Sequence, residues 1–123
     1  MKYMDYGMTE SEEKLANLIW VNEPVGSGDL VKICEKELGW KKSTTYTMLK
    51  KVIEKGVFRN IDAEVSSVLT KEKYNAKQSI QFVENTFSGS LPRFLTAFVS
   101  GKKISKKQAE ELKNLIDEYK EEE

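Results

Sequence analysis

The segment from Trp40 to Arg59 brings together side chains that suit nucleic-acid binding. Hydroxyls at the start of a helix can meet base edges and phosphates, and lysines around them neutralise backbone charge. Residues 41–59 contain six basic side chains against one acid, Glu54, inside a chain of zero net charge. The segment therefore predicts a DNA-binding surface, or else the basic face of a solvated amphipathic helix. The candidate DNA-binding residues are Lys41, Lys42, Ser43, Thr44, Tyr46, Thr47, Lys50, Lys51 and Arg59.

The same segment predicts the helix that would carry these residues. Leu49, Val52 and Ile53 recur at the spacing of one buried helical stripe, opposite the hydroxyls and lysines. Ser43 is the expected N-cap, because its hydroxyl can accept a hydrogen bond from a first-turn amide. Gly56 is expected just past the C-terminal end, where a residue without Cβ turns the chain.

Two further helices precede this one. Thr9 to Glu12 forms a capping-box pattern and predicts a first helix with an apolar face of Leu15, Leu18 and Ile19. A second helix is expected from about Asp29 to Leu38, ended by Gly39. Two helices joined by a short turn are typical of a helix-turn-helix.

A β-hairpin is expected to follow the third helix. Val57 and Phe58 lead into a plausible turn at residues 61–63, and residues 65–69 have the composition of a strand. Val25 is expected to add a short strand contact. Three helices and a hairpin make a winged helix-turn-helix, so we predict a mainly α fold with this domain over residues 1–70.

Composition excludes several functional classes. The chain of 123 residues has no histidine, a single cysteine, no glycine-rich phosphate loop and no cluster of carboxylates. We therefore expect no catalytic residues, no metal site and no cofactor, and we predict that the protein is not an enzyme. Cys34 has the spacing of a buried hydrophobic residue. No apolar run reaches the roughly 20 residues that cross a bilayer, and the N-terminus lacks the apolar core of a signal peptide, so we expect a cytoplasmic protein.

The C-terminal part predicts a helical dimerisation domain over residues 71–123. Helices are expected at about 71–87, 91–99 and 106–119, with Ser90 and Ser105 as N-caps. Some 50 residues of one chain cannot easily bury all their apolar faces. A homodimer with a shared core would do so, and the alternative is a monomer whose helices fold back on the N-terminal domain. The expected dimerisation residues are Phe87, Leu91, Phe94, Leu95, Phe98, Leu112, Leu115 and Ile116.

Three strings in this order resemble the penicillinase-repressor (BlaI/MecI/CopY type) family of bacterial transcriptional regulators. They are MTESEEKLANLIW, KKSTTYTMLKKVIEKGVF, and FVENTFSGSLPRFLTAFVSGKKISKKQAEELKNLIDEY. Trp20 ends the first helix, Trp40 precedes the third, and the resemblance covers nearly the whole chain from about Thr9. It implies a winged-helix repressor with a C-terminal dimerisation region.

The chain departs from the family pattern in three places. The family's wing usually carries a Gly-Arg tip, whereas this tip reads Ile61-Asp62-Ala63-Glu64. The β-lactam-responsive branch is cleaved at an Asn-Phe bond, and the matching place here is Ala97-Phe98. The copper-responsive branch carries C-terminal Cys-x-Cys motifs, which this sequence lacks.

These observations predict a homodimeric repressor that binds an inverted-repeat operator in double-stranded DNA and is relieved by a signal that the sequence does not identify. The competing interpretation is a winged-helix module that binds protein and no DNA. The neutral total charge and the acidic wing tip favour that alternative.

Overall fold

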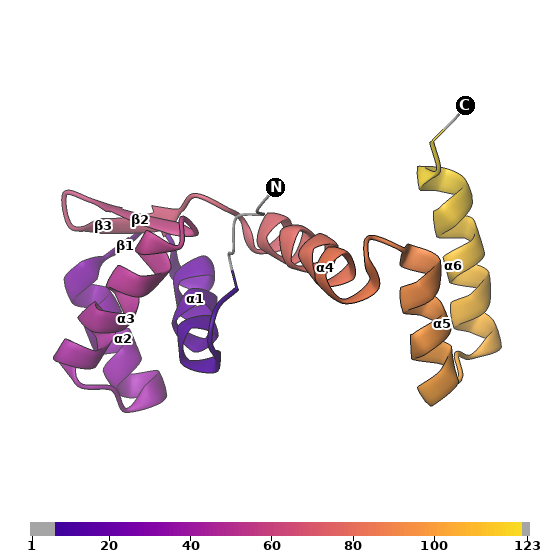
Figure 1. Cartoon of the computed structure of the whole chain (residues 1–123). Helices are drawn as coiled ribbons and strands as arrows, with labels where there is room; N and C mark the ends of the chain where they lie inside the picture. The colour runs from indigo at the N-terminus through magenta and orange to yellow at the C-terminus, as the bar shows by residue number, and fades with distance from the viewer. Residues whose placement is uncertain (1–6, 122–123) are drawn as a thin grey trace. The chain divides into compact units, whose positions relative to one another are not determined.

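The computed structural model describes residues 7–121, which fold into helices and a small sheet (Figure 1). The chain divides into two compact units, one up to Gln81 and one from Phe82 onward. The elements are α1 (Glu10–Asn22), β1 (Val25–Gly26), α2 (Ser27–Leu38), α3 (Lys42–Glu54), β2 (Phe58–Ile61), β3 (Glu64–Ser67), α4 (Lys71–Phe87), α5 (Leu91–Gly101) and α6 (Lys106–Tyr119).

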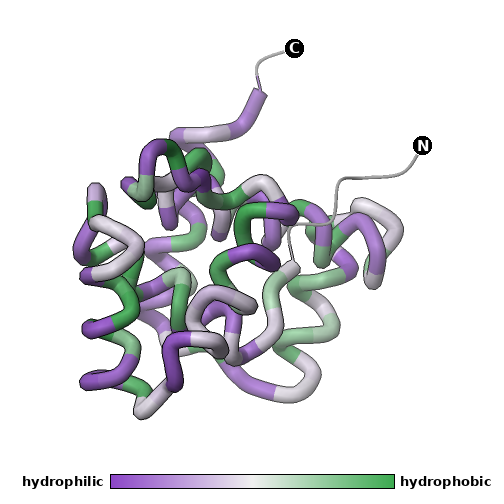
Figure 2. Tube along the Cα trace, turned by 90° about the vertical axis from the view of Figure 1, so that its left-hand side faces the viewer, coloured by the Kyte–Doolittle hydropathy of each residue, from purple (hydrophilic) through white to green (hydrophobic). Residues whose placement is uncertain are grey.

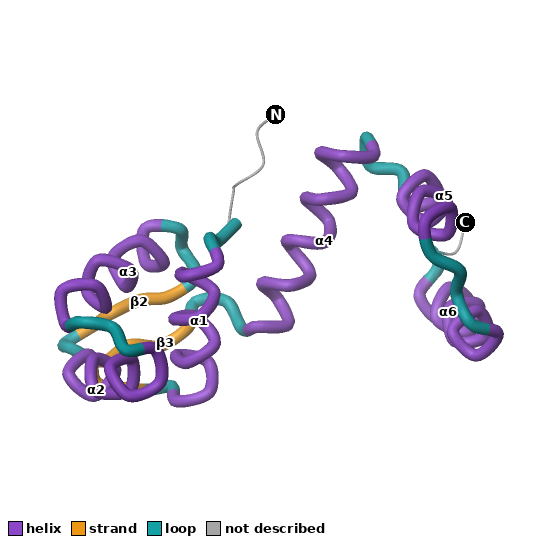
Figure 3. The backbone as a smooth tube through the Cα atoms, turned by 90° about the horizontal axis from the view of Figure 1, so that it is seen from below, coloured by secondary structure: helices purple, strands orange, loops and turns teal. Residues whose placement is uncertain are grey.

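The first unit is a winged helix-turn-helix, as predicted. Its sheet has the order β1-β3-β2, with both pairs antiparallel. Figure 3 shows the strands lying against α1, α2 and α3. Val25 forms the predicted strand contact, since it pairs with Val65 of β3. The turn of the hairpin consists of Asp62 and Ala63, both at positive φ, which is the backbone of a two-residue type I′ turn.

One hydrophobic core joins these elements. Leu15 and Ile19 of α1, Leu30 of α2, Val52 of α3 and Phe58 of β2 are almost completely buried. Figure 2 shows hydrophobic and hydrophilic residues alternating along the helices, as expected for helices with one buried face.

Trp20 closes this core with both its ring and its N–H. The ring packs on Phe58 and on Tyr74 of α4 at centroid distances of 5.2 and 5.6 Å. Trp20 Nε1 also donates a hydrogen bond of 3.0 Å to the Leu69 carbonyl. The first turn of α4 therefore packs within the winged-helix unit.

The helix ends follow the sequence signals, with one correction. The capping box at Thr9 is present in both directions, and Gly56 lies at positive φ just past α3. Ser43 is not the N-cap of α3, because Lys41 takes that position with extended backbone. The Thr45 amide donates to the Lys41 carbonyl at 3.1 Å, and the Thr45 side chain is fully buried, so packing fixes the start of the helix.

Other boundaries also differ from the expectation. α1 continues two residues past Trp20 to Asn22, and Ile61, expected in the turn, is the last residue of β2. α2 begins at Ser27, which is buried and whose amide donates to the Ala63 carbonyl at 2.8 Å. β3 ends at Ser67 and does not continue to Leu69. The amides of the next two residues both donate to the Val57 carbonyl, which turns the chain out of the strand.

The second unit contains the end of α4 together with α5 and α6. The predicted N-caps are present, since Ser90 Oγ accepts from the Arg93 amide and Ser105 Oγ accepts from the Gln108 amide. α5 extends to Gly101, two residues beyond the predicted end. Phe94 contacts three other phenylalanine rings, at centroid distances between 5.6 and 6.3 Å; its neighbours are Phe82, Phe87 and Phe98. Among the described residues, no helix is long and apolar enough to cross a membrane.

Candidate nucleic-acid interface

α3 presents one buried and one exposed face, as the sequence predicts. Thr45, Leu49 and Val52 face the core. At about 100° per residue, Ser43 and Thr47 lie on the opposite side. The next positions on that side are Lys50 and Glu54, while Tyr46 and Lys51 flank them. All of the predicted α3 residues are exposed except Thr44, which is half-buried.

The N-terminal end of α3 is chemically different from that of α1. In α1, Thr9 and Glu12 satisfy first-turn groups, and three acidic residues lie in the first turn. In α3, no side chain caps the helix and the first turn holds no acid. Lys41 and Lys42 lie there instead, both exposed. Uncapped first-turn amides and nearby lysines make this end favourable for a phosphate group.

The Thr47 hydroxyl and the Tyr46 ring on α3 have local contacts. Thr47 Oγ1 donates to the Ser43 carbonyl at 2.9 Å, so its proton is used within the helix while its lone pairs stay free for an outside donor. Lys42 Nζ lies 6.0 Å from the centroid of the Tyr46 ring. Such a contact is worth about 0.5–1 kcal/mol at an exposed site.

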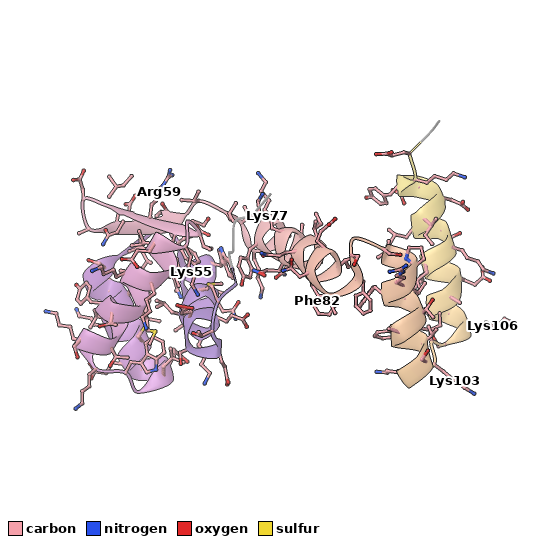
Figure 4. The ribbon with its side chains drawn as sticks, in the orientation of Figure 1. Lys55, Arg59, Lys77, Phe82, Lys103 and Lys106 are labelled. Atoms are coloured by element: carbon pink, nitrogen blue, oxygen red, sulfur yellow. The ribbon has the colours of Figure 1, made fainter. Side chains whose placement is uncertain are left out.

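Arg59 is the one predicted site residue that comes from the wing. Its Nε donates to Ser66 Oγ on the neighbouring strand at 3.1 Å. Figure 4 shows Arg59 on the hairpin. This hydrogen bond leaves the two terminal nitrogens of the guanidinium for a phosphate. Asp62 and Glu64 line the same depression as Arg59, so the acidic tip noted in the sequence lies beside the cation.

Lys55 does not belong to the exposed basic set, although it counts toward the charge of residues 41–59. Lys55 Nζ lies 2.6 Å from Glu12 Oε1 and 2.6 Å from the Gly7 carbonyl (Figure 4). The side chain of Glu12 is almost completely buried, and that of Lys55 is 30% exposed. The end of α3 is therefore fixed to the start of α1 by an ion pair.

This ion pair shifts the pKa of Glu12. Burial alone would raise the pKa of the carboxyl, but the hydrogen bond and charge of Lys55 and the hydrogen bonds of Thr9 outweigh burial. The net pKa lies below its ordinary value. Glu12 thus stays ionised and can accept from both Lys55 and the Thr9 amide.

Cys34 is a buried core residue, as predicted. Burial raises the pKa of its thiol, while the nearby Thr45 hydroxyl acts in the opposite direction. The contact is not an ordinary hydrogen bond, since Thr45 Oγ1 has no such partner among the described residues. Both side chains are fully buried, Cys34 on α2 and Thr45 on α3.

Sequence reasoning missed Glu23 as a structural contact of the wing. Glu23 Oε1 accepts from the Ser67 amide at 2.8 Å and from Ser67 Oγ at 2.7 Å. The partners lie 44 residues apart, so no local pattern could have revealed the contact.

The comparison with known families decides the identity of this fold. Residues 8–118 match the family model described as penicillinase repressor. The chain belongs to the penicillinase repressor family. This is a family of DNA-binding, winged-helix transcriptional repressors and not of enzymes, in agreement with the resemblance seen in the sequence.

Distant curated relatives of the penicillinase repressor family support the same conclusion. The chain is 21% identical to the methicillin resistance regulatory protein MecI of Mammaliicoccus sciuri, over 91% of this chain and 94% of that protein. The same figures hold for MecI of Staphylococcus aureus strain N315. It is 22% identical to the penicillinase repressor of Bacillus licheniformis, over 92% of this chain and 91% of that protein.

The residues predicted for dimerisation all lie in the second unit of the chain. Phe87 is the last residue of α4, and the others lie on α5 and α6. No described residue of either helix is fully buried. Leu91 is 62% exposed, Leu115 51% and Ile116 55%. An apolar groove runs between the two helices, lined by Phe94, Leu95, Phe98, Ile104, Leu112 and Leu115 together with the polar Gln108 and Glu111.

Proposed function

We propose that the chain is a sequence-specific repressor that binds an inverted-repeat operator as a homodimer. The observation that carries this proposal is the exposed face of α3. It combines hydroxyls, lysines and an uncapped N-terminal end within a winged helix of a repressor family. Thr44 and Thr47 would meet base edges with Tyr46 nearby, because short hydroxyls can bind the hydrogen-bonding groups of bases. Thr47 would act as an acceptor, since its proton is donated to the Ser43 carbonyl.

The cations would bind the DNA backbone. Lys42, Lys50 and Lys51 on α3 and Arg59 on the wing would contact phosphates or the groove rim, together with Ser43. Each neutralised phosphate releases counterions, so affinity should fall steeply with salt. Because the total charge of the chain is zero, the local charge of this face would provide the attraction.

The proposed dimer would use the exposed apolar surface of α5 and α6. Burying one Leu or Phe side chain is worth about 1.5–3 kcal/mol, so a few such residues from each chain can hold two copies together. A two-fold dimer would present two copies of α3. Operator half-sites should then lie about one helical turn, or a multiple of it, apart.

The test is binding to DNA fragments selected from the genome of origin, measured by fluorescence anisotropy at several salt concentrations. Lys50→Ala should lower the salt slope by about one and weaken all sequences alike. Thr47→Val should instead reduce discrimination between operator and scrambled duplex. Lys113→Ala is the matched control, since that exposed lysine lies on α6 beside Glu110.

Two results would contradict the proposal. One is a wild-type protein that passes through DNA-cellulose unretained at low salt, which would favour a protein-binding module. The other is a salt slope that Lys50→Ala and Lys113→Ala change equally. Sedimentation equilibrium tests the dimer separately, and a monomer at micromolar concentration would exclude two-fold binding.

A further inference from the structure

Glu23 connects the end of α1 to the wing, and the proposed function assigns it no role. Its backbone N–H caps α1 by donating to the Ile19 carbonyl at 2.8 Å. Its side chain reaches β3, where one carboxylate oxygen accepts two hydrogen bonds from Ser67. One residue therefore ends a helix and holds a strand.

The sheet register places Glu23 opposite Ser67. Ser27 donates to Ala63 across the sheet, and Val25 pairs with Val65. Because the pairs advance by two residues, the next one would join Glu23 and Ser67. In a regular pair the Glu23 N–H would donate to the Ser67 carbonyl and the Ser67 amide would donate to the Glu23 carbonyl. Here the Glu23 N–H donates to Ile19 in the cap of α1, and a side-chain oxygen of Glu23 accepts from the Ser67 amide.

This contact lies next to the residue that holds Arg59. Ser66 precedes Ser67 on β3, and its hydroxyl accepts from Arg59 Nε at 3.1 Å. Neighbouring residues of a strand point to opposite faces. Fixing Ser67 on one side therefore fixes the direction of Ser66 on the other.

We propose that Glu23 is a positioning residue for DNA binding, which orients the wing so that Arg59 presents its guanidinium to a phosphate. Glu23 itself touches no DNA. This inference rests on the proposed function, in which Arg59 contacts the backbone. The acidic tip makes orientation matter, because Asp62 and Glu64 beside Arg59 would repel a phosphate that approached from the wrong side.

The experiment compares Glu23→Met, which removes the acceptor at similar size, with Glu23→Gln, which keeps an acceptor oxygen. Glu13→Met serves as the control, since Glu13 is an exposed residue of α1, the helix that Glu23 caps. Two quantities are measured in the full chain: hydrogen exchange of the Ser67 amide, and the salt slope of binding to duplex DNA. Each is repeated in an Arg59→Ala background.

The expected result has three parts. Glu23→Met speeds exchange of the Ser67 amide and lowers the salt slope by up to about one, the value for one lost phosphate contact. Glu23→Gln retains most of both properties. In the Arg59→Ala background, Glu23→Met causes no further loss of slope, because the contact that it positions is already gone.

Three results would overturn the inference, and they separate it from the proposed function. Unchanged exchange at Ser67 would show that the hydrogen bonds do not hold the strand. Faster exchange with an unchanged salt slope, while Lys50→Ala still lowers the slope, would remove the positioning role and leave the proposed function intact. If neither Lys50→Ala nor Arg59→Ala alters duplex binding, both proposals are wrong.

Discussion

Replacing Glu12 by Gln tests whether an ion pair holds α3 in place. The change keeps the size of the side chain and an acceptor for the Thr9 amide, but it removes the negative charge opposite Lys55. Breaking a fully buried ion pair costs about 3–5 kcal/mol. Because Lys55 is 30% exposed and retains the Gly7 carbonyl as an acceptor, we expect a smaller loss, about 1.5–3 kcal/mol.

The pH dependence of this loss identifies its cause. Glu12 has a folded-state pKa below its ordinary value, so its contribution is complete above the ordinary carboxyl pKa of about 4.3. The contribution is lost as the pH falls through the lower, folded-state pKa. Wild type should therefore exceed Glu12→Gln in stability at neutral pH, and the difference should shrink in acid.

Urea denaturation at neutral and acidic pH, followed by circular dichroism, measures both effects. With a slope of about 1–3 kcal/mol per molar urea, the midpoint at neutral pH should fall by about 1 M. Glu13→Gln is the control, because Glu13 is exposed on the same helix turn. Equal midpoints for the two variants, or a difference that does not change with pH, would refute the reasoning.

Three further predictions concern single contacts. Ala63→Gly should stabilise the hairpin by about 1 kcal/mol, because Ala63 lies at a φ of 62° that costs a residue with Cβ about 1–2 kcal/mol; a lower urea midpoint than wild type would contradict this. Trp20→Phe should cost at least about 1 kcal/mol through the lost hydrogen bond to the Leu69 carbonyl, and an unchanged melting temperature would exclude that contribution. Leu115→Glu should shift the sedimentation equilibrium toward monomer while circular dichroism stays unchanged, whereas an undisturbed dimer would place the interface elsewhere.

Much of the fold could be predicted because its signals are local. The capping box at Thr9 and the turn at Gly56 are patterns of a few residues, and both are present in the structure. Of the predicted stripe of Leu49, Val52 and Ile53, the first two are buried and Ile53 is partly buried. Periodicity therefore located the buried side of α3, although it missed the full burial of Thr45 and the partial burial of Thr44.

The errors came from contacts that depend on packing. Ser43 has the right chemistry for an N-cap, but Thr45 is buried and the N-cap of α3 is Lys41. The sequence alone suggests that Lys55 is another surface cation. The structure shows that it pairs with Glu12, which lies 43 residues away in the sequence. Such pairs are invisible in a local pattern because many other acids could serve as partners.

The ion pair between Glu12 and Lys55 also bears on when DNA binding can arise during folding. It joins the beginning of the first helix to the end of the third, so it closes only after two segments 43 residues apart in the sequence have been brought together. A nascent or partly unfolded chain would carry every lysine of α3 without the geometry that aligns them. Retention of DNA should accordingly rise with completed tertiary structure and not with the mere presence of the basic segment.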